Sequence, residues 1–457
     1  MSSIVKVRSL KDPSRLTRRC DTCRRYSPER PAPGSSKLVE TRYRLVMSER
    51  TPVTDWTTDY DISDPAYIED PVPIWREMRE KCPIAHTERL QGSWNPTRFD
   101  DIRSLAKMVP ELSSRAPLVM PPPPDFPEQS LYEQQIAAAP ITADPPIHTW
   151  TRRMILPAFS PKTVNRYTYY TEELAHSLID GFIADGECDA AVDYSQQIPP
   201  RVIAHLLGVD PEMSDTFVGW VNDLLGEGLL DPTKRMAARE ALLSFLGVEV
   251  QERVQNPQED LLTELLHMEP IDENAEITPE VVVGIANLLV VAGIDTTWSS
   301  IGSALWHLGT NPDDLARLNA EPDLLPTAVE EFLRYYAPVT MARIADEDVS
   351  YGGVQIEKGD KVLMNFPAAC HDPEHFENPD EFIIDRQRNR HVAFGSGIHR
   401  CAGSNLARLE MNVALRVWLE RIPEFRVTDS DSMKWAGGQV RGPRIMHVSF
   451  PPGSPRS

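Results

Sequence analysis

A long apolar segment in the second half of the chain most constrains how this protein can fold. Thr278, Pro279 and Glu280 predict the start of a helix, because threonine caps an N-terminus and proline suits the first helical position. The segment 309–312, Gly-Thr-Asn-Pro, predicts its end. A helix of about thirty residues spans roughly 45 Å, enough to cross a whole domain. Because its flanks are apolar, we expect a central helix.

A polar interruption, Ala292-Gly-Ile-Asp-Thr-Thr297, lies midway along this segment. Gly293 allows another group to approach the backbone, and a threonine hydroxyl can bond the carbonyl one turn back and bend the helix. Two interpretations stay open on these residues alone. The interruption is either a buried polar kink without chemistry or part of a functional site.

A glycine-rich loop, Phe394-Gly-Ser-Gly-Ile-His-Arg-Cys-Ala-Gly403, precedes a second helix. Glycines at 395, 397 and 403 permit backbone angles and close approaches that a side chain would block. The spacing of Ala402, Leu406, Leu409, Val413 and Val417 predicts a buried helical stripe. The positive end of that helix, with Arg400, favours the thiolate form of Cys401. Alternatively, Cys401 is a small buried apolar residue, as most free cysteines are.

The loop pattern F-G-x-G-x-H-x-C-x-G resembles the haem-binding signature of the cytochrome P450 family, and Ala292 to Thr297 resembles its oxygen-activation motif. The resemblance covers essentially all of residues 55 to 450. It implies a mainly α fold with a smaller β-rich portion, in which haem b lies between the long helix and the helix after the cysteine. It also implies that Cys401 is the axial iron ligand, with Thr296 as the alcohol and Asp295 as the acid of proton delivery.

The same resemblance implies contacts that hold the haem. His148 and Arg152 are spaced i and i+4 on one helical face, and the family uses this pair for a propionate. The full implied set of cofactor contacts is His148, Arg152, Arg343, Phe394, His399 and Cys401, with His391 as a more distant candidate.

Glu331 and Arg334 are three residues apart on a predicted helix that ends before Pro338. An exposed pair of this kind would contribute little. Its position resembles the family's E-x-x-R pair, with Arg386 as third member, so we expect a structural trio. Cys370-His-Asp-Pro373 departs from the Asn-Arg-Asp-Pro common in relatives. His371 and His375 have a metal-like spacing, but Pro373 disfavours a regular helix there.

The charge balance, 47 basic against 68 acidic residues, gives −21 and argues against nucleic acid or an anionic membrane as partner. No uninterrupted apolar run reaches membrane-spanning length; the longest is 281–293. Six scattered cysteines do not suggest a secreted disulfide framework. We therefore expect a soluble cytoplasmic protein, and a monomer.

Residues 1–46 carry twelve basic and four acidic residues, with little apolar periodicity, and we expect them to be disordered. A transit peptide or nucleic-acid arm is conceivable, but we favour Met47 as the natural start. Cys20 and Cys23 have the spacing of half a zinc site without a second pair nearby. No linker follows Asp55, so residues 47–457 are expected to form a single domain.

The implied function is insertion of one oxygen atom from O2 into a C–H or C=C bond of a small hydrophobic compound, with an aromatic or terpenoid molecule as a first guess. No flavin or Rossmann segment is recognisable, so electrons should come from a ferredoxin and its reductase. The expected docking arginines are Arg153, Arg400, Arg408 and Arg416. Segments 110–143, 217–230 and 339–342 are expected to line the substrate chamber. A haem-thiolate gas sensor, a peroxide-driven peroxygenase and a helical scaffold without haem remain the alternatives.

Overall fold

The computed structural model describes residues 51–456 except 121–125, 227–230, 271–272 and 429–432. The expectations for residues 1–46, for Met47 as the start, for the Cys20 and Cys23 pair and for the prolines at 121–124 lie outside the described residues.

Helices make up most of the described chain, as predicted. They are α2 (Pro65–Glu69), α3 (Val72–Lys81), α4 (Phe99–Leu105), α5 (Leu131–Ile136), α6 (Ile147–Ile155), α7 (Pro161–Val164), α8 (Thr168–Asp180), α9 (Ile198–Leu207), α10 (Ser214–Leu225), α11 (Pro232–Gln255), α12 (Leu261–Leu266), α13 (Pro279–Thr310), α14 (Pro312–Ala320), α15 (Leu325–Tyr335), α16 (Phe366–Cys370) and α17 (Ser404–Arg421).

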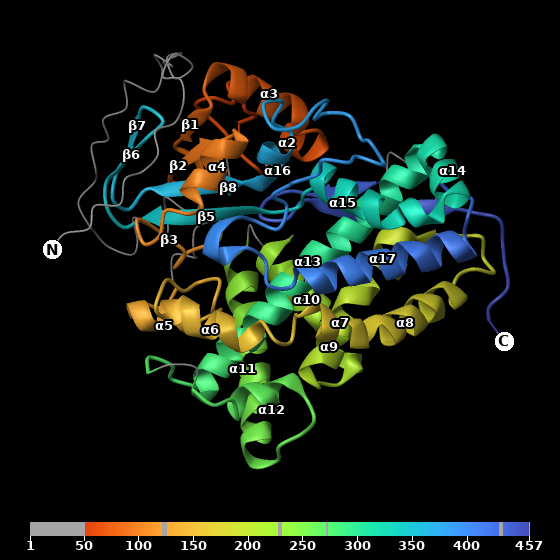
Figure 1. The fold of residues 1–457 in the computed structure, drawn as a ribbon, viewed down its shortest axis with the longest axis horizontal. Helices are drawn as coiled ribbons and strands as arrows, with labels where there is room; N and C mark the ends of the chain where they lie inside the picture. Colours follow the sequence, from red (N-terminus) through yellow and green to blue (C-terminus); the bar gives the residue numbers. More distant parts are fainter. Residues whose placement is uncertain (1–50, 121–125, 227–230, 271–272, 429–432, 457) are drawn as a thin grey trace.

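The strands form a smaller portion, gathered mainly at one end of the molecule with α2, α3, α4 and α16 (Figure 1). They are β1 (Ile84–Thr87), β2 (Ser93–Pro96), β3 (Leu112–Ser113), β4 (Glu187–Asp189), β5 (Thr340–Ala345), β6 (Val349–Tyr351), β7 (Val354–Ile356), β8 (Lys361–Asn365), β9 (Arg426–Val427), β10 (Lys434–Ala436), β11 (Gly442–Ile445) and β12 (His447–Ser449). The largest sheet has the order β1-β2-β8-β5-β3, and only its β2–β8 pair is parallel. The prediction of a mainly α fold with a smaller β-rich portion is confirmed.

Helix α13 runs through the centre of the helical part, beside α17 (Figure 1). The Thr278 hydroxyl accepts from the backbone N–H of Val281 at 3.4 Å, and Pro279 is the first helical residue, as predicted. The helix is continuous through the polar interruption at 292–297, so these residues do not break it. The Thr296 hydroxyl donates to the Ala292 carbonyl at 2.9 Å, which satisfies the hydroxyl within the helix.

By length and hydropathy α13 could cross a membrane, which corrects the sequence-based judgement that no segment is apolar enough. However, 61% of its most apolar window is buried inside the protein. Because neighbouring helices cover it, this apolarity belongs to a core helix.

Two parts of the secondary structure differ from the sequence prediction. The prolines of the stretch 110–146 predict irregular structure, yet this stretch contains α5, whose capping box joins Ser130 and Glu133. The strand expected over 348–356 is a hairpin, β6–β7, because Gly352 and Gly353 adopt φ values of 58° and 86° at its turn. The strand expected at Lys361 to Asn365 is present as β8.

The end of α5 is fastened to the central helix at a glycine. The Asn287 side-chain amide donates to the Ala137 carbonyl at 2.9 Å. A Cβ at Gly284 would lie 1.8 Å from the Ile136 carbonyl oxygen. Only glycine therefore lets the 131–137 segment lie against α13.

We predict that Gly284→Ala destabilises the protein by about 1–3 kcal/mol, because the Ile136 backbone must move away from α13. Urea unfolding followed by circular dichroism measures this change. The matched control is Gly219→Ala in α10, where an added Cβ meets nothing within 4 Å. There the alanine should stabilise the exposed helix by about 0.5–1 kcal/mol. Equal effects of the two variants would contradict the close packing.

Candidate active site

The cysteine loop has a backbone that its glycines make possible. Gly395 and Gly397 both have φ of 75°, and a Cβ at Gly397 would lie 2.6 Å from the Ala106 carbonyl oxygen. Gly403 has φ of −81° and is the N-cap of α17, and a Cβ there would lie 3.8 Å from the Phe159 ring, so neither an unusual angle nor a close contact among the described residues requires this glycine. The backbone N–H of Cys401 donates to the Phe394 carbonyl at 2.8 Å, which closes the loop.

The Cys401 side chain lies just before the N-terminus of α17, which begins three residues later at Ser404. Cys401 itself is exposed. The protein around it nevertheless raises the pKa of the thiol by desolvation, against the opposing effects of the Gly403 N–H and of nearby guanidinium groups such as Arg152. The expected stripe is present on α17: Leu406, Val413 and Val417 are buried and Leu409 is half-buried.

Phe394 is held by residues of two helices. The Arg408 guanidinium lies 4.5 Å from the centre of the Phe394 ring. Glu330 accepts from Arg408 at 2.5 Å and contacts His391 at 3.1 Å. Although burial opposes it, these two partners lower the pKa of Glu330 to about 2. His391 therefore contacts Glu330, on the far side of the loop from the cationic cluster described next.

Four cationic or imidazole side chains from α6, β5 and the loop gather beside Cys401: His148, Arg152, Arg343 and His399. The rings of His148 and His399 are 4.4 Å apart. His148 Nε2 contacts the Ile398 carbonyl at 3.1 Å, and Arg152 Nη2 donates to the Arg400 carbonyl at 2.5 Å. The structure thus brings all four predicted residues together.

Among the described residues, two buried nitrogen atoms of this cluster have no hydrogen-bond partner. Arg343 is 3% exposed, yet its Nε has no partner, and His399 Nε2 is likewise buried without one. Burial lowers the pKa of Arg343 to about 10. Burial and then Arg343 lower the pKa of His399 to about 2, and burial with Arg152 lowers that of His148 to about 4. Buried donors crowded by like charge fit an anionic ligand such as the two haem propionates.

The predicted acid and alcohol on α13 have different environments. Asp295 is fully buried, and its Oδ1 accepts from Ser299 Oγ at 3.0 Å and from Arg444 Nη2 at 2.8 Å. Its Oδ2 has no hydrogen-bond partner. Burial raises the pKa of Asp295, against the opposing effects of Arg444 and Ser299. The carboxylate therefore bonds to β11 and to the next turn, rather than to the Thr296 hydroxyl.

Sequence reasoning missed Arg444, the basic partner of Asp295. The arginine lies 149 positions further along the chain and belongs to no motif. Close packing of β11 on α13 brings Arg444 to Asp295. This packing requires glycine at position 442, because a Cβ there would lie 2.4 Å from Ser299 Cβ.

Two of the three segments expected to line the substrate chamber meet in the structure. The Ala342 N–H donates to the Pro117 carbonyl at 2.8 Å. The Gln439 side chain accepts from the Val119 N–H at 2.8 Å, so the β10–β11 connection joins them. In the third segment Phe217 is fully buried on α10, which packs on α13, and 227–230 lies outside the described residues. Gln439 had no sequence signal.

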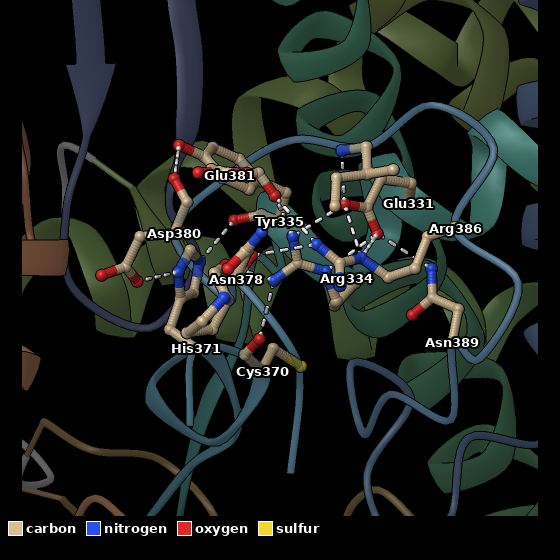
Figure 2. Close-up of polar contacts among 12 residues, drawn as sticks. Glu331, Arg334, Tyr335, Cys370, His371, Asn378, Asp380, Glu381, Arg386 and Asn389 are labelled. Atoms are coloured by element: carbon tan, nitrogen blue, oxygen red, sulfur yellow. Dashed lines mark hydrogen bonds and ion pairs between the residues drawn. The ribbon is translucent and has the colours of Figure 1, made fainter. Parts of the chain in front are cut away.

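The Glu331, Arg334 and Arg386 trio forms a buried network (Figure 2). Arg334 Nε and Nη2 donate to Glu331 at 2.8 and 2.7 Å, and Arg386 Nε donates to it at 3.0 Å. The other Arg334 donors reach the carbonyls of Cys370, Pro379 and Glu381 at 2.6–3.0 Å. All five N–H groups of Arg334 are therefore satisfied, as a structural role requires.

The segment 370–373, whose sequence differs from the Asn-Arg-Asp-Pro common in relatives, is held by residues of the same network. His371 Nε2 contacts the Tyr335 carbonyl at 3.0 Å and His371 Nδ1 contacts Asp380 at 3.1 Å (Figure 2). Both ring nitrogens are therefore used within the protein. His371 therefore has a structural role at this position.

The fold is that of a haem-thiolate oxidoreductase, with α13 and α17 side by side and the cysteine loop before α17. A family model described as cytochrome P450 matches residues 210–435. Cytochrome P450 107B1 of Saccharopolyspora erythraea is 32% identical over 380 residues, 81% of this chain and 93% of that protein. The vitamin D(3) 25-hydroxylase of Pseudonocardia autotrophica is 33% identical over 414 residues, 88% of this chain and 99% of that protein.

Solved structures agree. The bacillaene polyketide synthase cytochrome P450 PksS of Bacillus subtilis superposes with a TM-score of 0.75 at 29% identity, covering 86% of this chain and 99% of that one. This chain belongs to the cytochrome P450 family. Members are haem b monooxygenases that use O2, a hydrophobic substrate and, in general, a redox partner.

We predict that Glu331→Gln costs about 3–5 kcal/mol, because two buried guanidinium groups lose their shared counter-charge. Urea unfolding of the haem-loaded protein measures the loss. The control Lys81→Gln removes an exposed pair with Glu77 and should leave the unfolding midpoint unchanged. A similar midpoint for both variants would show that the network does not stabilise the fold.

Proposed function

We propose that this protein is a monooxygenase that takes electrons from a ferredoxin and its reductase and inserts one atom of O2 into a small hydrophobic molecule. The observation that carries the proposal is the cluster of buried, unsatisfied donors, Arg343 Nε and His399 Nε2, beside the exposed Cys401. A cysteine next to an anion-binding cluster is what a haem with two propionates requires.

Cys401 is proposed as the axial ligand of the haem iron. Its place before the N-terminus of α17, with Arg152, Arg400 and Arg408 nearby, supports the thiolate. Haem b supplies the iron centre at which dioxygen is activated. Phe394 is proposed to shield the sulfur, since Arg408 holds its ring in place.

His148, Arg152, Arg343 and His399 are proposed to bind the propionates. Two carboxylates would satisfy the unpartnered donors and relieve repulsion within the cluster. Arg152 has a second task, since its bond to the Arg400 carbonyl ties α6 to the cysteine loop.

Thr296 and Asp295 are proposed to deliver protons to the reacting oxygen. Asp295 Oδ2 is buried and unbonded, so it can hold a proton while Oδ1 stays fixed by Arg444 and Ser299. Burial raises the pKa of Asp295, which favours the protonated form that a proton donor needs. The Thr296 hydroxyl is proposed as the final proton donor, and its hydrogen bond to the Ala292 carbonyl holds it in position.

Electron transfer is proposed to occur at the surface around the cysteine loop. Arg153 and Arg400 are exposed there, with Leu156 and Ile398 at 42% and 39% exposure. An apolar centre with a cationic rim suits an acidic ferredoxin. Of the four arginines expected to dock it, Arg408 pairs with Glu330 and Arg416 pairs with Glu172 and Glu420. Among the four, Arg153 and Arg400 are proposed as the main contacts because both are exposed beside the loop.

The protein is proposed to work as a cytoplasmic monomer on a hydrophobic substrate. The segments 110–143 and 339–342, both proposed to line the chamber, are joined by the hydrogen bond from the Ala342 N–H to the Pro117 carbonyl. The relatives named as hydroxylases support oxygen insertion as the reaction.

Cys401→Ser should abolish the red-shifted band that a thiolate-ligated ferrous haem shows with carbon monoxide, because a serine oxygen donates less electron density to iron. Absorbance spectra of the reduced, carbon monoxide-treated variant test this. Cys188→Ser, at a half-buried cysteine in β4, is the control and should keep the band. Retention of the band by Cys401→Ser would disprove the proposed ligand.

Thr296→Ala should keep haem but divert electrons to hydrogen peroxide, lowering the product formed per NADPH by about tenfold or more. Turnover with ferredoxin, reductase and a substrate found by spin-shift screening measures both yields. Thr310→Ala is the control, because it removes the same hydroxyl-to-carbonyl bond at the far end of α13.

If Thr296→Ala still formed one product molecule per NADPH consumed, Thr296 would have no role in proton delivery. No NADPH consumption by the unaltered protein would favour a gas sensor. Turnover with hydrogen peroxide alone would favour a peroxygenase.

A further inference from the structure

A cavity of about 290 Å³ lies where α2 and α3 meet the ends of α13 and α15 and the β10–β11 hairpin. Its lining is rich in aromatic rings, namely Tyr67, Trp75, Trp306, Tyr335, Tyr336 and Trp435. Trp306, Tyr335, Tyr336 and Trp435 are only half-buried, so part of each ring remains accessible. The proposed reaction uses none of these residues.

The cavity lies on the opposite face of β5 from the cationic cluster. Successive side chains of a strand point to opposite faces. Arg343 therefore shares its face with Met341, whereas Thr340 shares the other with Ala342. Thr340 lines the cavity, and Ala342 packs in the same apolar cluster as Tyr67 and Trp75.

The hydroxyls of the two tyrosines at the end of α15, Tyr335 and Tyr336, already have hydrogen-bond partners. Tyr335 donates to the Asp380 carbonyl at 3.2 Å (Figure 2), and the Tyr336 hydroxyl contacts His307 Nδ1 at 2.7 Å. His307 in turn contacts Asp314 at 2.8 Å. These bonds fix the two rings, so they offer mainly their surfaces to a ligand.

Three charged residues line the cavity. Arg441 donates to the Ile68 carbonyl at 3.1 and 2.9 Å and to that of Glu69 at 3.0 Å, and it stacks 4.4 Å from the Trp435 ring centre. Glu69 and Asp70 are exposed, and among the described residues neither forms an ion pair. Two carboxylates against one guanidinium that is already bonded leave the lining with net negative charge.

We propose that this cavity is a second ligand site, which binds a small organic cation with apolar substituents such as a quaternary ammonium. Aromatic faces attract cations through their quadrupoles, and desolvation strengthens the attraction. Carboxylates at the rim add to it and disfavour anions. The site is independent of the haem reaction, so its test needs no turnover.

Isothermal titration of the haem-loaded protein with choline tests the proposal, with neohexyl alcohol as the uncharged carbon isostere. Choline should bind about tenfold more tightly, corresponding to about 1.4 kcal/mol of cation–π and charge attraction. The haem spectrum should stay unchanged, which separates this site from the substrate chamber. Equal binding of the two compounds, no binding of choline, or a haem spin shift would each overturn the proposal.

Two variants locate the site. Glu69→Gln with Asp70→Asn should weaken choline binding about threefold and spare neohexyl alcohol, because the aromatic rings remain and still attract the cation. Glu187→Gln with Glu212→Gln, at exposed acids elsewhere, removes the same charge and should leave affinity unchanged.

Trp306→Leu should weaken choline binding about threefold and spare the alcohol, because leucine keeps apolar contact without a ring quadrupole. Haem absorbance and the unfolding midpoint confirm that each variant is folded. Unchanged choline affinity in either the rim variant or Trp306→Leu would show that the cation binds elsewhere.

Discussion

One buried carboxylate organises the part of the chain that leads to the cysteine loop. Glu331 receives two guanidinium groups, the backbone N–H of Ile383 at 2.9 Å and the Asn389 amide at 3.0 Å. An ionised carboxylate in the interior would cost several kcal/mol if its oxygens lacked such partners. Because the partners come from α15 and from residues 377–389, satisfying this one charge fixes the path of the chain up to Phe394. The geometry at Cys401 therefore depends on a network that takes no part in chemistry.

The chain treats its buried arginines in two ways, and the difference separates scaffold from site. Arg334 has every donor satisfied by protein atoms, whereas Arg343 has an unpartnered Nε beside an equally unpartnered His399 Nε2. A folded chain rarely leaves buried donors unmet unless something else completes them. Both arginines are almost fully buried, so exposure alone could not distinguish them. The hydrogen bonds of Arg334 therefore stabilise the fold, whereas the unpartnered Nε of Arg343, within the described residues, supports its proposed role in binding a propionate.

Local sequence signals predicted the elements whose start or buried face is determined by residues close together in the chain. Thr278 and Pro279 begin α13 as expected, and the stripe from Leu406 to Val417 is present on α17. The capping box of Ser130 and Glu133 is a local signal for α5 that the sequence prediction missed, because that prediction rested on the surrounding prolines. Partners separated by more than a hundred positions, such as Arg444 with Asp295, could not be read from one sequence. Tertiary packing decides them, and no periodicity or cap records it.

The β10–β11 hairpin connects features that the sequence keeps apart. Its second strand brings Arg444 to Asp295, and this requires Gly442 because any side chain there would strike Ser299. At the start of that strand the Arg441 N–H donates to the Pro338 carbonyl at 2.8 Å, and the Arg441 side chain lines the aromatic cavity. The short segment 441–444 therefore supplies one arginine to the cavity lining and another to the carboxylate of Asp295. Because Arg441 is already bonded to the Ile68 and Glu69 carbonyls, a ligand can occupy the cavity without moving this segment.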